Sequence, residues 1–124
     1  MDPIANMLVS IKNGYMAKKL KVSIPYSKFK FEIAKVLEKE NVLGKVEKKS
    51  SEIIMELLYS HQKPRISEIK RISKSGLRIY AKSKNIKRVR GGRGLTLIST
   101  SKGIMTDTQA KSKKLGGEVI CQIW

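Results

Sequence analysis

The 124-residue chain carries 27 Lys and Arg residues against 10 Asp and Glu residues, a formal net charge of +17 at pH 7. Such an excess repels itself in an isolated protein, so a polyanion normally compensates it, and nucleic acid and an anionic membrane are the two candidates. Hydrophobic residues make up 40% of the chain, which excludes a disordered basic tail. At this length a protein can fold without a metal or a disulfide.

The basic residues are concentrated in the second half of the chain. Residues 69–124 hold 14 basic and 2 acidic residues, whereas residues 1–68 hold 13 and 8. All the arginines lie between Arg65 and Arg93, and the planar guanidinium group suits phosphate better than the ammonium of lysine. We therefore expect the second half to carry the principal binding face. A solvated surface that only keeps the protein soluble is the alternative.

Two features argue against a secreted or membrane protein. Cys121 is the only cysteine, which excludes a disulfide framework and a cysteine-rich metal site, and it is most simply a small core residue. The N-terminus lacks the layout of a signal peptide, and no apolar run approaches the roughly 20 residues of a membrane span. We expect a reducing compartment and no membrane partner.

The first half predicts a helix, a strand and a second helix. Asp2 can cap a helix whose first residue is Pro3. Apolar side chains then recur at helical spacing on one face: Ile4, Met7, Leu8, Ile11 and Tyr15. Residues 21–25 alternate and predict a short strand. Ser27 is the expected cap of the second helix, which ends at Asn41 or Gly44. Its inner face should hold Phe29, Ile33, Val36 and Leu37.

Strands dominate the rest of the chain. They are expected at residues 43–49, 53–59, 66–72, 77–82, 95–99 and 118–123. Residues 86–89 predict a helical turn, and residues 91–94 a glycine-rich loop. Thr106 and Gln109 match a capping box that opens a short helix, which the glycines at 116–117 should end.

These elements indicate an α+β protein with two small lobes. The N-terminal lobe, residues 1–61, has the order α-β-α-β-β, and the C-terminal lobe, residues 62–124, is rich in strands with one short helix. Because the C-terminal lobe holds most of the excess charge, it is the expected nucleic-acid-binding lobe.

The sequence contains no recognisable catalytic motif. His61 is the only histidine and lies in a polar connector, and the glycines at 91–94 match neither a Walker loop nor a dinucleotide fingerprint. The acids Asp2, Asp107 and Glu118 stand apart, at a cap, a helix start and a strand. We expect no catalytic residue, metal, cofactor or small-molecule substrate. A small nucleic-acid-modifying enzyme that uses His61 and Asp107 is the rival hypothesis.

The segment between the strand at 95–99 and the short helix is the most informative. Ser99, Thr100 and Ser101 bring three hydroxyl groups together, and each hydroxyl can donate and accept a hydrogen bond. That versatility suits the 2′-hydroxyls, phosphates and base edges in the shallow groove of an RNA helix. Lys102 adds a phosphate contact, and Gly103 permits unusual backbone geometry. An ordinary Ser/Thr turn before a helix is the alternative.

A second candidate group lies on the strand at 77–82. Alternation puts Arg78, Tyr80 and Lys82 on one face of this strand. The other face then holds Leu77, Ile79 and Ala81. A basic–aromatic–basic stripe can stack a splayed base and hold its flanking phosphates. A tyrosine that only covers the edge of the core is the alternative.

Five segments, in order along the whole chain, resemble the family of small-subunit ribosomal protein eight. Residues 99–107 (STSKGIMTD) and 116–121 (GGEVIC) are similar to its C-terminal signature. Residues 2–5 (DPIA), 11–13 (IKN) and 76–80 (GLRIY) resemble its other motifs, in the bacterial and organellar form. Ser75 stands where the family often has proline, and Arg93 where it usually has an apolar residue.

The resemblance implies a two-lobed protein that binds the central domain of small-subunit ribosomal RNA early in assembly, next to other small-subunit proteins. Such ribosomes are cytoplasmic, or lie in the stroma or matrix of an organelle. The family's hydroxyl loop and strand tyrosine touch RNA, and its N-terminal lobe makes further contacts. The residues expected to bind RNA are Ser99, Thr100, Ser101, Lys102, Gly103, Tyr80, Arg78, Lys82, Lys12, Asn13, Lys28 and Arg93. A basic DNA-associated architectural protein is the alternative.

Overall fold

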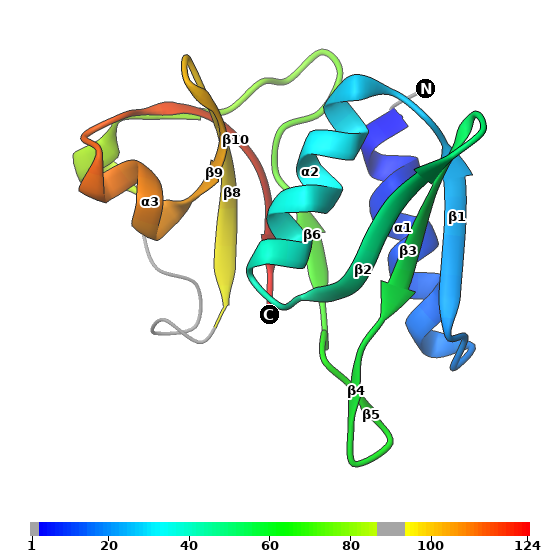
Figure 1. The fold of residues 1–124 in the computed structure, drawn as a ribbon. Helices are drawn as coiled ribbons and strands as arrows, with labels where there is room; N and C mark the ends of the chain where they lie inside the picture. Colours follow the sequence, from blue (N-terminus) through cyan, green and yellow to red (C-terminus); the bar gives the residue numbers. More distant parts are fainter. Residues whose placement is uncertain (1–2, 87–93) are drawn as a thin grey trace. The chain divides into compact units, whose positions relative to one another are not determined.

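A computed structural model describes residues 3–86 and 94–124 and divides the chain into two compact units (Figure 1). We call Pro3–Ser67 the N-terminal unit and Glu68–Trp124 the C-terminal unit. The described residues form three α-helices and several antiparallel sheets, which confirms the predicted α+β class. The lobe boundary predicted at residues 61–62 lies six residues before this division.

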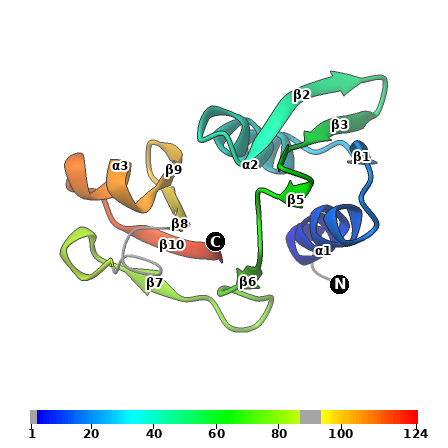
Figure 2. The same ribbon diagram turned by 90° about the horizontal axis from the view of Figure 1, so that it is seen from below.

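The N-terminal unit packs two helices on a three-stranded sheet. Its elements are α1 (Pro3–Met16), β1 (Lys21–Pro25), α2 (Lys28–Lys39), β2 (Leu43–Lys49), β3 (Glu52–Leu57), β4 (Tyr59–Ser60) and β5 (Lys63–Pro64). The sheet has the order β1-β3-β2, and β4 and β5 form a separate hairpin. Both helices lie on the same side of the sheet, α2 against β2 and α1 against β1 (Figures 1 and 2).

Local signals in the N-terminal unit predict its helices well. The apolar face of α1 is buried as expected, and the Ser27 hydroxyl accepts a hydrogen bond from the Lys30 N–H at 3.2 Å, as an N-cap does. Asn41 adopts a left-handed conformation (φ 59°) just after α2, which confirms it as the end of that helix. Phe29 was wrongly predicted to lie on the inner face, because 40% of it is exposed.

Tyr15 ties α1 to the rest of this unit. Its hydroxyl donates to the Val42 carbonyl oxygen at 3.0 Å and accepts from the Leu58 N–H at 3.1 Å. Burial raises the pKa of the Tyr15 phenol above its usual value, so the neutral donor persists well above neutral pH. The core around it includes Ile11, Ile33 and Met55, all fully buried.

The C-terminal unit is a sheet with one short helix. Its elements are β6 (Ile69–Arg71), β7 (Tyr80–Ala81), the 3₁₀-helix η1 (Ser83–Asn85), β8 (Leu95–Thr100), β9 (Gly103–Thr106), α3 (Asp107–Ser112) and β10 (Gly117–Ile123). The strand order is β6-β10-β8-β9, and β7 also pairs with β10. One core cluster of this unit is formed by Ile86, Ile98, Met105, Ala110 and Val119.

Two predicted strands of this unit are much shorter than expected. Residues 66–72 form only β6, and residues 77–82 form only β7, because both segments pair with β10. The Ser73 N–H donates to the Val119 carbonyl oxygen, and the Val119 N–H donates to the Ile79 carbonyl oxygen. Residues 74–78 therefore loop out of the sheet between these two contacts. Leu77 and Ile79, expected on the face of the strand opposite Tyr80, are 61% and 38% exposed.

The ends of α3 show one correct and one wrong prediction. The capping box is confirmed: the Gln109 N–H donates to the Thr106 hydroxyl at 3.3 Å, and the Thr106 N–H donates to the Gln109 side-chain oxygen at 3.0 Å. The glycines at 116–117 do not end α3. The helix stops at Ser112, and Lys114 takes the left-handed conformation (φ 54°) that follows it. The helical turn predicted at 86–89 falls mostly outside the described residues, and η1 lies just before it.

The two glycines instead let β10 pass close to its neighbours. A Cβ on Gly117 would overlap the carbonyl oxygen of Ser99, and a Cβ on Gly116 would lie 2.5 Å from the carbonyl oxygen of Ala81. Both obstacles are backbone atoms, which cannot move aside without shifting a strand. The pair therefore sets how closely β10 approaches both β7 and β8.

We expect Gly117→Ala to destabilise the protein, because overfilling a tight contact costs about 1–3 kcal/mol. Gly44→Ala is the matched control: its Cβ would meet the Glu56 side chain, whose carboxylate end can rotate away and whose Cβ would lie 3.1 Å from it. Denaturant unfolding of both variants gives the comparison. Equal stability of the two variants would show that β10 does not need the close approach.

We also expect the Cys121 thiol to be unreactive in the native protein. Cys121 is completely buried, and burial raises the pKa of its thiol from 9.0 to about 12. The thiolate is the reactive form, so at pH 8 Ellman's reagent should label Cys121 only as fast as the protein unfolds. Labelling in guanidinium chloride should be complete at once. Immediate labelling of Cys121 without denaturant would show that its thiol is not buried in the native protein.

Candidate nucleic-acid interface

The hydroxyl loop predicted at 99–103 is the tight turn between β8 and β9. Thr100 ends β8, and Gly103, with a left-handed φ of 110°, begins β9. The Thr100 hydroxyl donates to the Gly103 carbonyl oxygen at 2.7 Å and accepts from the Lys102 N–H at 3.1 Å. Both bonds lie within the turn, so this hydroxyl holds the turn in shape.

The two serines of the loop are placed differently from Thr100. Ser101 is exposed at the tip of the turn beside exposed Lys102, and Ser99 is half-buried on β8. Within the described part of the chain, neither serine hydroxyl forms a hydrogen bond. Each can donate one hydrogen bond and accept two. The turn therefore presents polar groups that an incoming ligand can satisfy.

Tyr80 lies in the same row of the sheet as Ser99. Glu118 on β10 pairs with Tyr80 on β7 and with Ser99 on β8. Directly opposed residues on antiparallel strands project from the same face, so these three side chains share one face. Ala81 and Val119, which alternate with Tyr80 and Glu118, pack in or against the core cluster on the other face. Tyr80 is 70% exposed, so its ring is available for stacking.

Glu118 is a member of this surface that the sequence did not single out as part of the site. The Arg78 guanidinium donates to its carboxylate at 3.0 Å, in an ion pair whose side chains are 51% and 20% exposed. Arg78 is therefore engaged within the protein, and it can meet a phosphate by exchanging Glu118 for it. The partner was hidden in the sequence because the two residues are 40 positions apart.

Ser73 was also missed, and it holds the base of the loop that carries Arg78. Its buried hydroxyl accepts from the Ile79 N–H at 2.9 Å and donates to the Ile79 carbonyl oxygen at 3.2 Å. At the far end of the loop, Lys74 and Leu77 exchange two backbone hydrogen bonds of 2.8 and 3.0 Å. The loop is thus closed at both ends before β7 begins.

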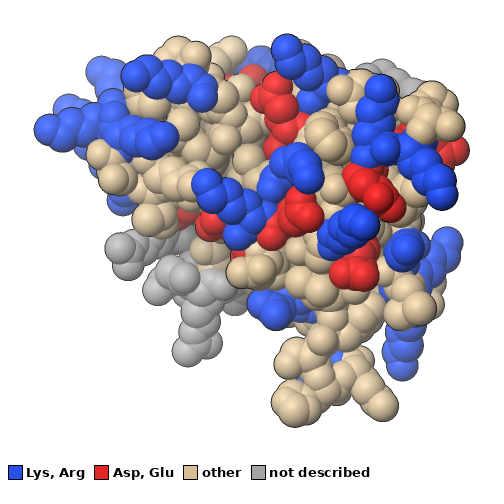
Figure 3. All heavy atoms as spheres, viewed as in Figure 1, with Lys and Arg blue, Asp and Glu red and all other residues tan. Residues whose placement is uncertain are grey.

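Lysines gather on the part of the C-terminal unit that carries α3 and the start of β10 (Figure 3). Five of them are exposed and form no ion pair with a described residue: Lys82, Lys84, Lys111, Lys113 and Lys114. The carboxylate of Asp107 is buried and accepts from the Thr96 N–H at 3.3 Å, and Glu118 is engaged with Arg78. These carboxylates therefore leave the lysines uncompensated. Over α2 and β2, in contrast, acidic and basic side chains alternate (Figure 3).

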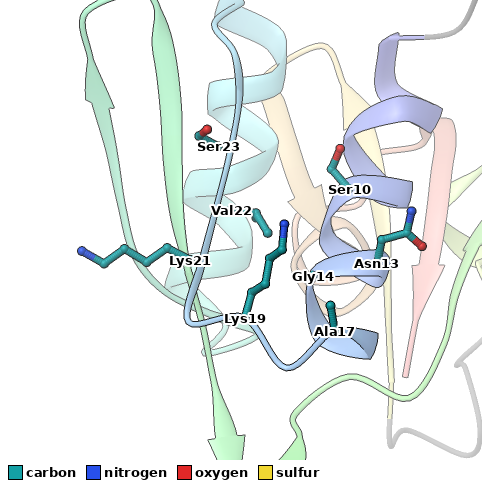
Figure 4. Close-up of a pocket in the computed structure, with 8 residues that line it drawn as sticks. All are labelled: Ser10, Asn13, Gly14, Ala17, Lys19, Lys21, Val22 and Ser23. Atoms are coloured by element: carbon teal, nitrogen blue, oxygen red, sulfur yellow. The ribbon is translucent and has the colours of Figure 1, made fainter.

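The predicted residues of the N-terminal unit lie on its two helices. Lys12 is half-buried and Asn13 exposed on α1, and exposed Lys28 is the first residue of α2. Asn13 borders a cavity of about 480 Å³ between α1 and β1, to which Ser10 and Lys19 also contribute. Figure 4 shows Lys19 extending into the space between the two elements.

His61 and Asp107, the residues of the rival enzyme hypothesis, belong to different units. Among them no three His, Cys, Asp or Glu side chains come together to hold a metal ion. His61 is exposed in the β4–β5 turn with a left-handed φ of 53°, and the Asp107 carboxylate is used to hold β8. No helix in the described ranges has the length and apolar character of a membrane span. Arg93 lies outside the described residues.

Comparisons with known proteins point to one family. The family model described as Ribosomal protein S8 matches residues 2–124. Relatives called small ribosomal subunit protein uS8 include those of Caldanaerobacter subterraneus, 50% identical over 128 residues, and Oleidesulfovibrio alaskensis, 46% identical over 123. The Pseudomonas aeruginosa relative is 44% identical over 126 residues. These alignments cover 99% of this chain and 97 to 98% of the relatives. The chain therefore belongs to the ribosomal protein S8 family, whose members are structural proteins of the small ribosomal subunit and not enzymes.

Proposed function

We propose that the chain binds the central domain of small-subunit ribosomal RNA and stabilises its fold while the subunit assembles. The observation that carries this proposal is the shared face of Tyr80, Glu118 and Ser99, beside a turn with an exposed, unsatisfied Ser101 hydroxyl. An exposed aromatic ring next to free hydroxyls suits an irregular RNA with an unstacked base and an accessible minor groove. Neighbouring small-subunit proteins complete the environment.

Two kinds of contact supply affinity and specificity. Phosphate contacts supply affinity and register, and Lys102, Lys82 and the exposed lysines near α3 are placed to make them. Ser99 and Ser101 read 2′-hydroxyls or base edges, and Tyr80 stacks on a base. Thr100 and Gly103 act indirectly, because their hydrogen bond shapes the turn.

The N-terminal unit adds a second contact with ribosomal RNA through Lys12, Asn13 and Lys28. Exposed Asn13 and Lys28 are accessible to RNA, and the amide of Asn13 can both donate and accept. Arg78 contributes a phosphate contact by exchanging Glu118 for the phosphate. Arg93 stays a predicted phosphate contact. The ribosome that holds the chain is cytoplasmic or belongs to an organelle.

The sugar distinguishes this function from that of a DNA-associated protein. A reader of 2′-hydroxyls should lose most of its affinity on an all-deoxy copy of its site, because Ser99 and Ser101 lose their partners. Titration of the protein with the central domain of small-subunit RNA and with the deoxy copy, at equal salt, gives the comparison. Equal affinity for the two would favour the DNA-associated alternative.

We expect Ser101→Ala and Lys102→Ala to weaken binding in different ways. Loss of the Ser101 hydroxyl leaves an RNA group unsatisfied, which costs about 1–3 kcal/mol on the cognate RNA and almost nothing on an unrelated duplex. Loss of Lys102 weakens binding to both RNAs and reduces the magnitude of the slope of log affinity against log salt by about 0.7 to 0.9. Filter binding at several salt concentrations measures both effects.

Thr100→Val is the control for the shape of the turn, since it removes the two hydrogen bonds within the turn and leaves Ser101 in place. It should lower stability as well as affinity, whereas Ser101→Ala should leave the unfolding free energy unchanged. If folded Ser101→Ala binds the cognate RNA with the same affinity as the parent, the Ser101 hydroxyl does not recognise RNA.

A further inference from the structure

An aromatic cluster stands at the corner of the N-terminal unit where the β1–α2 loop meets the β2–β3 hairpin. The ring of Tyr26, in that loop, lies 5.8 Å from the ring of Phe31 on α2, centroid to centroid, at an interplanar angle of 49°. The Lys48 ammonium, near the end of β2, lies 4.6 Å from the centroid of the Tyr26 ring. Figure 1 shows the β1–α2 loop running beside the turn of this hairpin.

This corner is held in place by the backbone. The Tyr26 N–H donates to the Ser51 carbonyl oxygen at 2.8 Å, which joins the loop to the hairpin turn. Ser27 caps α2 directly after Tyr26. The position of the Tyr26 ring is therefore largely defined by the fold. A defined ring binds a flat partner with little loss of conformational entropy.

The Tyr26 ring is only partly covered by its neighbours in the protein. Tyr26 is 37% exposed, and its hydroxyl forms no hydrogen bond with a described residue. Phe29, on the first turn of α2, is 40% exposed. Tyr26, Phe29 and Tyr80 are the three exposed residues among the seven aromatic residues of the chain. A partner with a flat apolar surface would cover Tyr26 and Phe29.

The charges around the ring favour a phosphate-bearing partner. The segments 25–28 and 48–52, which meet at this corner, contain Lys28, Lys48 and Lys49 against the single acid Glu52. Within the described residues these three lysines form no ion pair, and the only partner of the Lys48 ammonium is the Tyr26 ring. An apolar protein surface would leave these charges buried and uncompensated. A nucleotide, in contrast, brings both a flat base and an anionic phosphate.

We propose that Tyr26 is the stacking platform for an unpaired RNA base, whose flanking phosphates are bound by Lys48 and Lys28. This inference rests on the proposed function, because the base belongs to the RNA that the C-terminal unit recognises. On binding, the Lys48 ammonium moves from the ring to a phosphate, and the base takes its place on the ring. The exchange is favourable, since base–aromatic stacking and a phosphate ion pair replace an exposed cation–π contact.

The test compares two substitutions of Tyr26 on purified small-subunit RNA. Tyr26→Leu keeps an apolar side chain but removes the stacking surface, and should weaken binding roughly five- to a hundredfold. Tyr26→Trp keeps a flat ring and should bind within about twofold of the parent. Lys48→Met should weaken binding and reduce the salt slope by about one phosphate contact. Circular dichroism and thermal unfolding establish that each variant is folded.

Photocrosslinking of the parent protein gives a readout that needs no substitution. Ultraviolet irradiation of the complex, followed by digestion and mass spectrometry, should find a nucleotide attached to the peptide that contains Tyr26. Absence of this crosslink while a Tyr80 crosslink forms would overturn the inference. Unchanged RNA affinity of folded Tyr26→Leu would also overturn the stacking platform. If that variant binds RNA like the parent but is incorporated poorly into ribosomal subunits, the partner of Tyr26 is a protein.

The two proposals fail in different ways. If the parent does not prefer the central-domain RNA over its deoxy copy, the proposed function fails. If the parent shows that preference and Ser101→Ala weakens it, but Tyr26→Leu binds like the parent, only the stacking platform is wrong. Equal loss of affinity and of thermal stability in Tyr26→Leu and Tyr26→Trp would assign the cluster to hairpin attachment alone and also overturn the platform.

Discussion

The surface of the C-terminal unit depends on how closely β10 passes between β7 and β8. Gly116 and Gly117 have no side chain, so the backbones of Ala81 and Ser99 can approach β10 from its two sides. The close approach brings Tyr80 and Ser99 into one row, although 18 residues separate them in the sequence. A bulkier residue would push one strand away and separate the aromatic ring from the hydroxyl turn. The glycine pair is therefore a packing requirement with a functional consequence.

Polar side chains on this surface and directly beneath it fall into two groups. Thr100 and Ser73 satisfy their hydrogen bonds within the protein and hold the backbone in shape. Ser101 and Ser99 leave theirs open, and only an open group gains a new partner on binding. Arg78 belongs to neither group: it is exposed, but Glu118 neutralises part of its charge. The net charge of the chain consequently overstates the positive charge that this surface offers to a polyanion.

Features encoded by a few neighbouring residues were predicted correctly from the sequence. The Ser27 cap, the capping box at Thr106 and the apolar face of α1 each follow from residues within one or a few helical turns. The hydroxyl segment forms a turn, but the turn joins β8 to β9, a strand that was not predicted, instead of leading directly into α3. The different roles of Thr100 and the two serines could not be predicted from the sequence, since hydroxyl partners within a turn depend on backbone angles.

Features that depend on pairing between distant segments were missed. The strand expected at 77–82 is only β7, because residues 72–73 and 79 compete for the same edge of β10 and force residues 74–78 outward. The glycines at 116–117 have the composition of a helix end, but they serve strand packing, and Lys114 takes the left-handed position after α3. Phe29 follows the helical period yet is exposed, because the period does not say how far the neighbouring sheet extends.

The central claim is that Tyr80 and the β8–β9 turn form one RNA-binding surface. Hydrogen exchange of the backbone amides, measured by mass spectrometry with and without small-subunit RNA, tests it most directly. The account predicts that RNA slows exchange in residues 78–82 and 99–103 together, at the same RNA concentration. Protection of only one of these segments, or of neither while the protein is fully bound, would contradict a single surface built around β10.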